Sequence, residues 1–171
     1  SPLTVPMYIP NIASAELAMK IRARGPGMGV STACATGGHA LAVAVRLIQA
    51  GDADCMIAGG VEACLTPFSV AAFASMRALS TRNDDPKRAS RPFDRDRDGF
   101  VMSEGGAAFV LEDIRAARAR GARILGVLEG VGMSQDAYHL VAPDPEAGSV
   151  VCAMKRALED AGLAPGDIGY I

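Results

Sequence analysis

The cysteine at position 34 is the residue of this sequence best placed to do chemistry. It stands in "GVSTACATGGHA", where a short apolar run of small residues gives way to a helical pattern. A thiol at a helix N-terminus lies beside unpaired backbone N–H groups and the positive end of the helix dipole, which favour the thiolate. The same N–H groups can stabilise the oxyanion of a tetrahedral intermediate. The pattern fits two roles for Cys34 equally well, that of a nucleophile and that of a small buried cysteine of structural role.

The remaining cysteines and the two histidines carry weaker signals. Three cysteines lie within apolar runs, where a structural role is expected: Cys55, Cys64 and Cys152. His39 follows Cys34 by five residues and is interpreted as a core histidine. His139, three residues after Asp136, could act near a site or only hold a loop together. Because no CxxC pair is present, we expect neither a zinc site nor a disulfide framework, and a reducing compartment is favoured.

A polar connection over residues 65–98 is long enough to carry function or to cover a site. At its end, four residues match the first positions of a calcium-binding loop: Asp94, Asp96, Asp98 and Gly99. Position twelve of that loop should be a glutamate, but it is Gly105, and Pro92 stands where a helix should enter. We therefore expect ion pairs within an exposed loop and no bound metal.

The apolar periodicity predicts helices and strands in alternation. The expected helices cover residues 11–24, 34–50, 68–76, 114–123 and 147–161, and the expected strands cover 27–33, 54–60, 105–112 and 124–134. Strand, helix and strand follow one another near Cys34 at the spacing of a parallel βαβ unit. Since the helix at 34–50 is apolar nearly all round, it should be covered on almost every side.

Composition excludes several classes of protein. The 171 residues are 50% hydrophobic and 21% charged, with a net charge of −2, so a buried core is expected and a nucleic-acid binder is not. No apolar run approaches the roughly 20 residues that span a bilayer, and the N-terminus lacks the features of a signal peptide. The sequence thus predicts a soluble, cytoplasmic protein.

Five motifs together resemble the elongating β-ketoacyl-acyl carrier protein synthases of type II fatty acid synthesis. They are "STACATG", "GDADCMIAGGVEA", "RALSTRND", "SRPFDRDRDGFVMSEG" and "SQDAYH". The resemblance runs along the whole chain and implies the α/β thiolase-like fold, a mixed, mainly parallel sheet between helical layers. It also implies that the chain is a central portion of that fold. Residues 1–114 would be the later part of the first half, with the nucleophile, and residues 115–171 the start of the second.

The resemblance implies a decarboxylative Claisen condensation in which Cys34 accepts the acyl group and its own N–H contributes to the oxyanion hole. Other positions match residues that line the acyl pocket, reach the partner subunit's pocket, contact acyl carrier protein or support the site: Phe73, Thr4, Arg77, Asp136 and His139. No cofactor of its own is implied, because phosphopantetheine arrives on the carrier protein. A homodimer would form through the strand that precedes Cys34.

Some of the family's catalytic groups have no match in these residues. His39 and His139 match neither catalytic histidine, and the motif lysine and gating phenylalanine are also unmatched. After His139, where the family commonly has a hydroxyl residue along the pantetheine path, the sequence continues Leu140-Val141-Ala142. We therefore expect this chain alone not to complete the condensation. Two alternatives stay open: the ketosynthase of a type II polyketide pathway, and a non-catalytic dimerisation or scaffold fragment.

Overall fold

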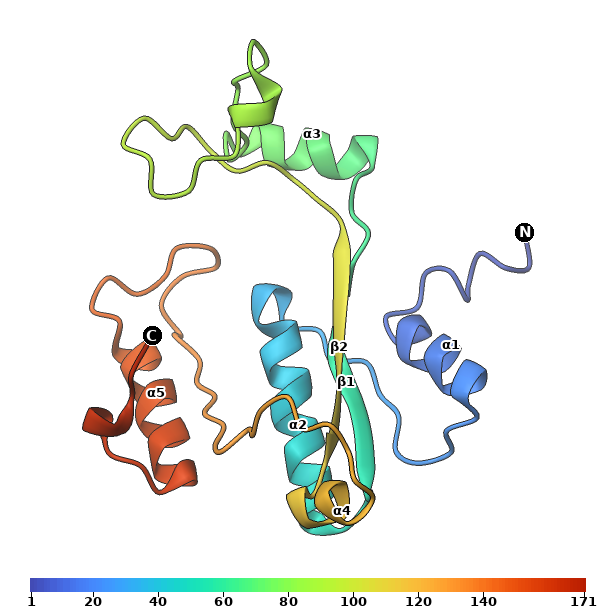
Figure 1. The fold of residues 1–171 in the computed structure, drawn as a ribbon. Coiled ribbons are helices and arrows are strands. Elements are labelled where there is room, and N and C mark those ends of the chain that lie inside the picture. The colour runs from blue at the N-terminus through green and yellow to red at the C-terminus, as the bar shows by residue number, and fades with distance from the viewer. The chain divides into compact units, whose positions relative to one another are not determined.

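The computed structural model describes all residues from Ser1 to Ile171, and its contacts divide them into two compact units. The first unit comprises Ser1–Gly59 and Phe109–Ile171, and the second comprises Gly60–Ala108. Figure 1 follows the chain through both units. The boundary expected between residues 114 and 115 concerns the halves of the family's fold, and it stays a prediction.

The helices of the first unit lie where the periodicity predicts them. They are α1 (Ile12–Ile21), α2 (Thr36–Ala50), α4 (Ile114–Ala119) and α5 (Gly148–Ala161), with short 3₁₀ turns at Ala33–Ala35 and Pro165–Asp167. Glycines in the left-handed conformation end α2 and α5, at Gly51 with φ 81° and at Gly162 with φ 67°. Asp113 caps α4 by accepting a hydrogen bond from the N–H of Arg115. That arginine's hydrogen bonds lower the pKa of Asp113 to about 2.

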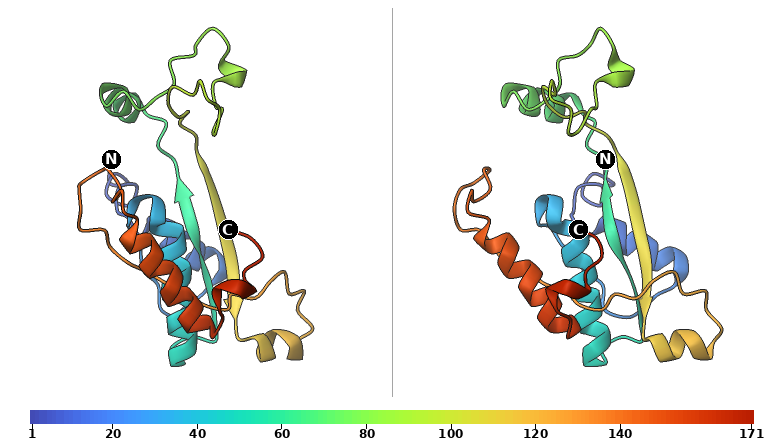
Figure 2. Two further views of the ribbon diagram at one scale, coloured as in Figure 1. Left: turned by 90° about the vertical axis from the view of Figure 1, so that its left-hand side faces the viewer. Right: turned by 60° about the vertical axis from the view of Figure 1, so that its left-hand side comes forward.

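One sheet is present, and it consists of two strands. They are β1 (Cys55–Glu62) and β2 (Gly105–Glu112), which pair with each other and run in opposite directions, as Figure 2 shows. The strands expected over residues 27–33 and 124–134 are not formed, and within this chain the predicted parallel βαβ pairing is absent. A strand forms when its N–H and C=O groups bond to those of another strand, and neither segment is paired in this way in the structure.

The segment expected as the last strand is fastened to α5 in another way. At both Gly130 and Gly132 an added Cβ would lie 2.7 Å from a backbone nitrogen of α5, so glycine permits the close approach. The N–H of Val131 donates to the Asp160 carboxylate at 2.9 Å. This bond, with the nearby Arg46 guanidinium, holds the pKa of Asp160 below its usual value. A side chain of α5 thus binds this segment, in place of the backbone groups of a neighbouring strand.

The second unit contains one α-helix, α3 (Pro67–Ser75), and a 3₁₀ turn at Pro86–Arg88. Thr66 caps α3 by accepting a hydrogen bond from the N–H of Ser69 at 3.2 Å. An isolated bridge joins Leu79 to Phe100 and closes the long connection between them. The helix expected at 68–76 is therefore confirmed, and most of the connection is irregular.

Little of the chain is buried. The buried residues are all alanines: Ala42, Ala44, Ala58, Ala89 and Ala117. Only two of them belong to α2, so the covering expected on nearly every side of this helix is not seen here. None of the helices combines the length and the apolar character needed to cross a membrane.

Candidate active site

Cys34 lies in the middle of the 3₁₀ turn Ala33–Ala35, directly before α2. Its side chain is exposed. Ala33 has a positive φ of 50°, a conformation that costs a residue with a side chain about 1 kcal/mol or more. The N–H of Ala35 donates to the carbonyl of Thr32 at 3.1 Å, whereas the N–H of Cys34 donates to no group in the turn. The turn therefore presents a thiol together with an unengaged backbone donor.

Two hydroxyl residues, Thr32 before Cys34 and Thr36 after it, are joined by a hydrogen bond. The N–H of Thr32 donates to Oγ1 of Thr36 at 2.9 Å, and Oγ1 of Thr32 is hydrogen-bonded to Nδ1 of His39 at 2.8 Å. His39 is half-buried and has a polar partner, in agreement with a satisfied histidine. The sequence pattern by itself indicated no role for Thr32 and Thr36. The feature of the sequence that could have indicated a role is a hydroxyl residue two positions before the cysteine and another two positions after it.

Asp136 and His139 both hold the loop that precedes α5. The carboxylate of Asp136 accepts a hydrogen bond from the Ser149 hydroxyl in the first turn of α5 and another, at 3.0 Å, from the N–H of Asp144. Nδ1 of His139 accepts two bonds of 3.1 Å from the N–H groups of residues that follow it, Val141 and Ala142. These contacts give both residues a structural task. Their supporting role beside a catalytic chamber stays a prediction.

The other residues suggested by the resemblance are distributed over both units. Phe73 and Arg77 belong to the second unit, whereas Thr4 and Cys34 belong to the first. Phe73 packs edge-on against Phe100 with ring centroids 5.3 Å apart. Arg77 is exposed just beyond the end of α3 with a φ of 54°, and Thr4 is exposed in an N-terminal turn. Their proposed contacts with acyl chain, carrier protein and partner subunit stay predictions.

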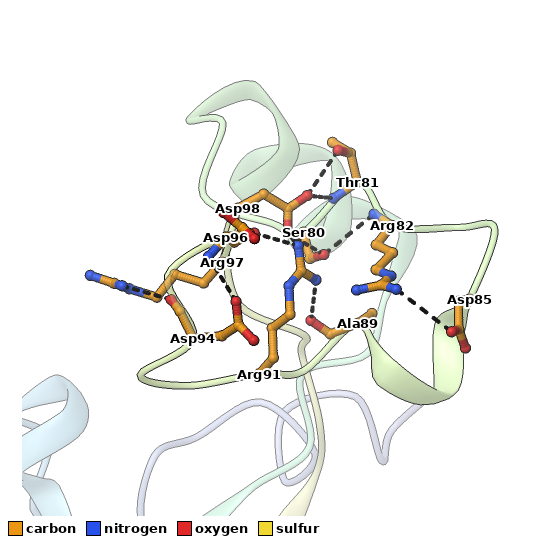
Figure 3. A network of polar contacts seen from close by, with 10 residues as sticks. All are labelled: Ser80, Thr81, Arg82, Asp85, Ala89, Arg91, Asp94, Asp96, Arg97 and Asp98. Carbon is orange, nitrogen blue, oxygen red and sulfur yellow. Dashed lines mark hydrogen bonds and ion pairs between the residues drawn. The ribbon is translucent and has the colours of Figure 1, made fainter.

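The polar loop between Ser80 and Asp98 forms a network, which Figure 3 shows. The Asp98 carboxylate accepts hydrogen bonds from the Ser80 hydroxyl at 2.6 Å, the Thr81 N–H at 2.8 Å and the Arg91 guanidinium at 3.1 Å. These bonds, the Ser80 bond above all, hold the pKa of Asp98 far below its usual value. The ion pairs predicted for this loop are confirmed: Arg88 pairs with Asp85, and Arg91 pairs with Asp98.

The comparison with protein families identifies the chain. Residues 1–117 match the N-terminal domain of beta-ketoacyl synthases, and residues 125–171 match the C-terminal domain. The chain belongs to the beta-ketoacyl synthase family. The resemblance recognised from the motifs is thereby confirmed.

Curated relatives of this beta-ketoacyl synthase chain include two bacterial 3-oxoacyl-(acyl-carrier-protein) synthases 2. The protein of Synechocystis sp. is 52% identical and that of Coxiella burnetii 48% identical, each over the whole of this chain. The chain spans 41% of the length of each of these relatives.

Solved structures confirm the thiolase-like class of fold. A beta-ketoacyl synthase from Burkholderia phymatum matches 95% of this chain and 39% of its own, with a TM-score of 0.87 and 39% identity. A type II PKS ketosynthase, solved with its acyl-carrier protein and bound to the hexaketide, matches 94% of this chain and 40% of its own. Its TM-score is 0.88 and its identity is 35%.

Proposed function

We propose that this chain is the acyl-accepting part of a β-ketoacyl-acyl carrier protein synthase of fatty acid elongation, with Cys34 as the nucleophile. The observation that carries the proposal is the turn Ala33–Ala35, which exposes a thiol and an unengaged N–H at the start of α2. The chain that contains this turn is about half identical to 3-oxoacyl-(acyl-carrier-protein) synthases 2. Motif, turn geometry and relatives therefore support one chemistry.

The turn provides the nucleophile and one oxyanion donor for the first half of the reaction. Sγ of Cys34, as thiolate, attacks the carbonyl carbon of the acyl thioester, and the N–H of Cys34 donates to the oxyanion that forms. Collapse of the intermediate breaks the bond to the pantetheine sulfur, which leaves as a thiolate and takes up a proton. The acyl group is then a thioester of Cys34.

The second half needs further groups. The malonyl thioester loses CO₂, and the resulting carbanion attacks the carbonyl carbon of the Cys34 thioester, which releases the Cys34 thiolate. His39 and His139 already have partners in the structure, Thr32 for one and backbone N–H groups for the other. Since neither matches a histidine that the family uses for decarboxylation, we expect this chain alone to stop at the acyl-enzyme.

The proposed partners follow from the same chemistry. Acyl carrier protein delivers the acyl group on phosphopantetheine, and exposed Arg77 is the proposed contact for its acidic surface. The segment that precedes Cys34, residues 27–33, is the proposed dimer contact, with Thr4 reaching the other subunit. Four free cysteines suit a reducing, cytoplasmic setting.

Acylation of the purified chain tests the proposal. After incubation with acyl-loaded carrier protein, intact mass should increase by one acyl group, and peptide mapping should place that group on Cys34. The variant Cys34→Ser should gain no acyl group at the three cysteines that remain. Equal or absent acylation of all four cysteines would favour the scaffold alternative. Formation of a ketoacyl product from added malonyl-carrier protein would contradict the expected stop at the acyl-enzyme.

The polyketide alternative is supported by the 35% identity to a ketosynthase whose structure holds a hexaketide. Higher identity to the fatty acid enzymes, 52% and 48%, favours the first proposal. Competition between a saturated acyl thioester and a poly-β-ketoacyl thioester separates them. We expect the saturated acyl group to be transferred to Cys34 faster, and the opposite preference would favour the polyketide pathway.

A further inference from the structure

We propose that Thr36 and His39 are positioning residues that hold the Cys34 turn in its reactive shape by anchoring Thr32. The proposal rests on the proposed function of Cys34 as the nucleophile. It assigns a task to two α2 side chains that project back toward the residue before the turn. Neither residue touches the acyl group in this proposal, since both act through Thr32, Thr36 at its backbone N–H and His39 at its hydroxyl.

Thr32 is anchored at three groups, and all three lead forward in the sequence. Its N–H donates to Oγ1 of Thr36 at 2.9 Å, its hydroxyl is bonded to Nδ1 of His39 at 2.8 Å, and its carbonyl accepts from the N–H of Ala35 at 3.1 Å. Because Thr36 and His39 are three residues apart on α2, their side chains share one face of the helix. Two side chains of α2 thus hold Thr32, the residue directly before the turn, by hydrogen bonds.

The hydrogen bonds of Thr32 hold the next residue, Ala33, in a strained backbone conformation. Ala33, the residue next to Thr32, has a φ of 50°, which an alanine adopts at a cost in free energy. Only the two residues Ala33 and Cys34 separate Thr32 from the first anchor at Ala35. If the anchors were lost, Ala33 could relax to a negative φ, and the relaxation would rotate the peptide that carries the N–H of Cys34. The sulfur and the oxyanion donor would then no longer face the same acyl carbonyl.

The anchors link the turn to an ordered helix. Thr32, Ala33 and Cys34 are exposed within this chain, so the hydrogen bonds of Thr32 are the contacts that the chain itself provides to the turn. Thr36 and His39 are half-buried on α2, which has a defined helical backbone. The hydrogen bonds therefore transmit the position of an ordered helix to the turn that carries Cys34.

The test is the single-turnover rate of acyl transfer to Cys34 in the whole chain, followed by intact mass. We expect Thr36→Val, which keeps the shape but removes the acceptor, to lower the rate about tenfold, and His39→Leu to do the same. Thr36→Ser and His39→Asn, which keep a polar atom near the anchor, should restore most of the rate. The apparent dissociation constant for the acyl donor should change less than twofold, because the effect concerns the reacting geometry.

Matched controls separate positioning from loss of folding. Ser14→Ala also removes a helix-associated hydroxyl, which donates to the Asn11 carbonyl at 2.9 Å at the start of α1, and should leave acyl transfer to Cys34 unchanged. Within each variant, the alkylation rates of Cys55 and Cys152 by iodoacetamide report whether the rest of the first unit is intact, and they should stay at the wild-type values.

The outcomes distinguish this inference from the function on which it rests. If wild-type Cys34 accepts no acyl group, the proposed function fails. If wild-type Cys34 is acylated and Thr36→Val and His39→Leu react within twofold of it, the positioning role is refuted. Loss of rate that the serine and asparagine variants do not restore would also refute it, because the hydrogen bonds would then not be the cause.

Discussion

Replacing Gly99 by alanine should open the bridge that closes the polar loop of the second unit. Gly99 has a φ of 147°, in the region that favours glycine, and an added Cβ would lie 2.6 Å from the Ser80 nitrogen and 2.7 Å from the Ala78 oxygen. Both neighbours are backbone atoms, so no side chain can swing away. The two backbone segments must therefore separate, or Gly99 must change conformation.

The size of the effect follows from the hydrogen bonds at this position. The N–H of Phe100 donates to the Ala78 carbonyl and the N–H of Ser80 to the Phe100 carbonyl, both at 3.0 Å. Ordinary contact near 3.5 Å requires the two segments to move apart by about 1 Å, which stretches both bonds beyond hydrogen-bonding distance. With about 1 kcal/mol for each bond and about 1 kcal/mol of backbone strain, local opening becomes easier by about 3 kcal/mol, or about 100-fold.

Amide hydrogen exchange at Ser80 and Phe100 measures this opening directly. In Gly99→Ala the protection of both amides should decrease about 100-fold, or to the limit of a free amide. Gly105→Ala is the matched control, because an added Cβ at Gly105 meets nothing within 4 Å. Amides of α5, in the first unit, should keep their protection in both variants. Protection of Ser80 and Phe100 within threefold of wild type in Gly99→Ala would refute the reasoning.

Two further predictions concern charge. Because the Ser80 hydroxyl and Thr81 N–H hold the pKa of Asp98 far below normal, its carboxylate should stabilise the second unit above the unfolded pKa of about 3.9. That stabilisation should be lost as pH falls toward the lower folded pKa. The thermal unfolding temperature should therefore decline between pH 7 and pH 2. This decline should be smaller in Asp98→Asn and unchanged in the control Asp84→Asn. Partial burial and then the Glu112 charge raise the pKa of Cys55, so Glu112→Gln should speed its alkylation at pH 7.5 about threefold, with Cys152 as the unchanged control. A Cys55 rate that stays constant or falls would contradict this account.

The sequence alone determined the helices and the place of the proposed nucleophile at the start of one of them. Five expected helices were found within a few residues of their predicted bounds, because apolar periodicity, caps and terminal glycines act within one or two turns. The strands at Cys55–Glu62 and Gly105–Glu112 were also predicted. The position of Cys34 at the start of α2 followed from a local change of pattern, and the family followed from motifs that are local as well.

The tertiary structure decided what depends on contacts between distant residues. Whether residues 27–33 and 124–134 become strands depends on a neighbouring backbone, which periodicity does not reveal, and neither segment is a strand here. The need for glycine at position 99 arises from the backbone of Ser80, nineteen residues earlier in the chain. The hydrogen bonds that join Thr36 and His39 to Thr32 form because the turn folds back on α2. Residue types set which contacts are possible, and the path of the backbone selects those that form.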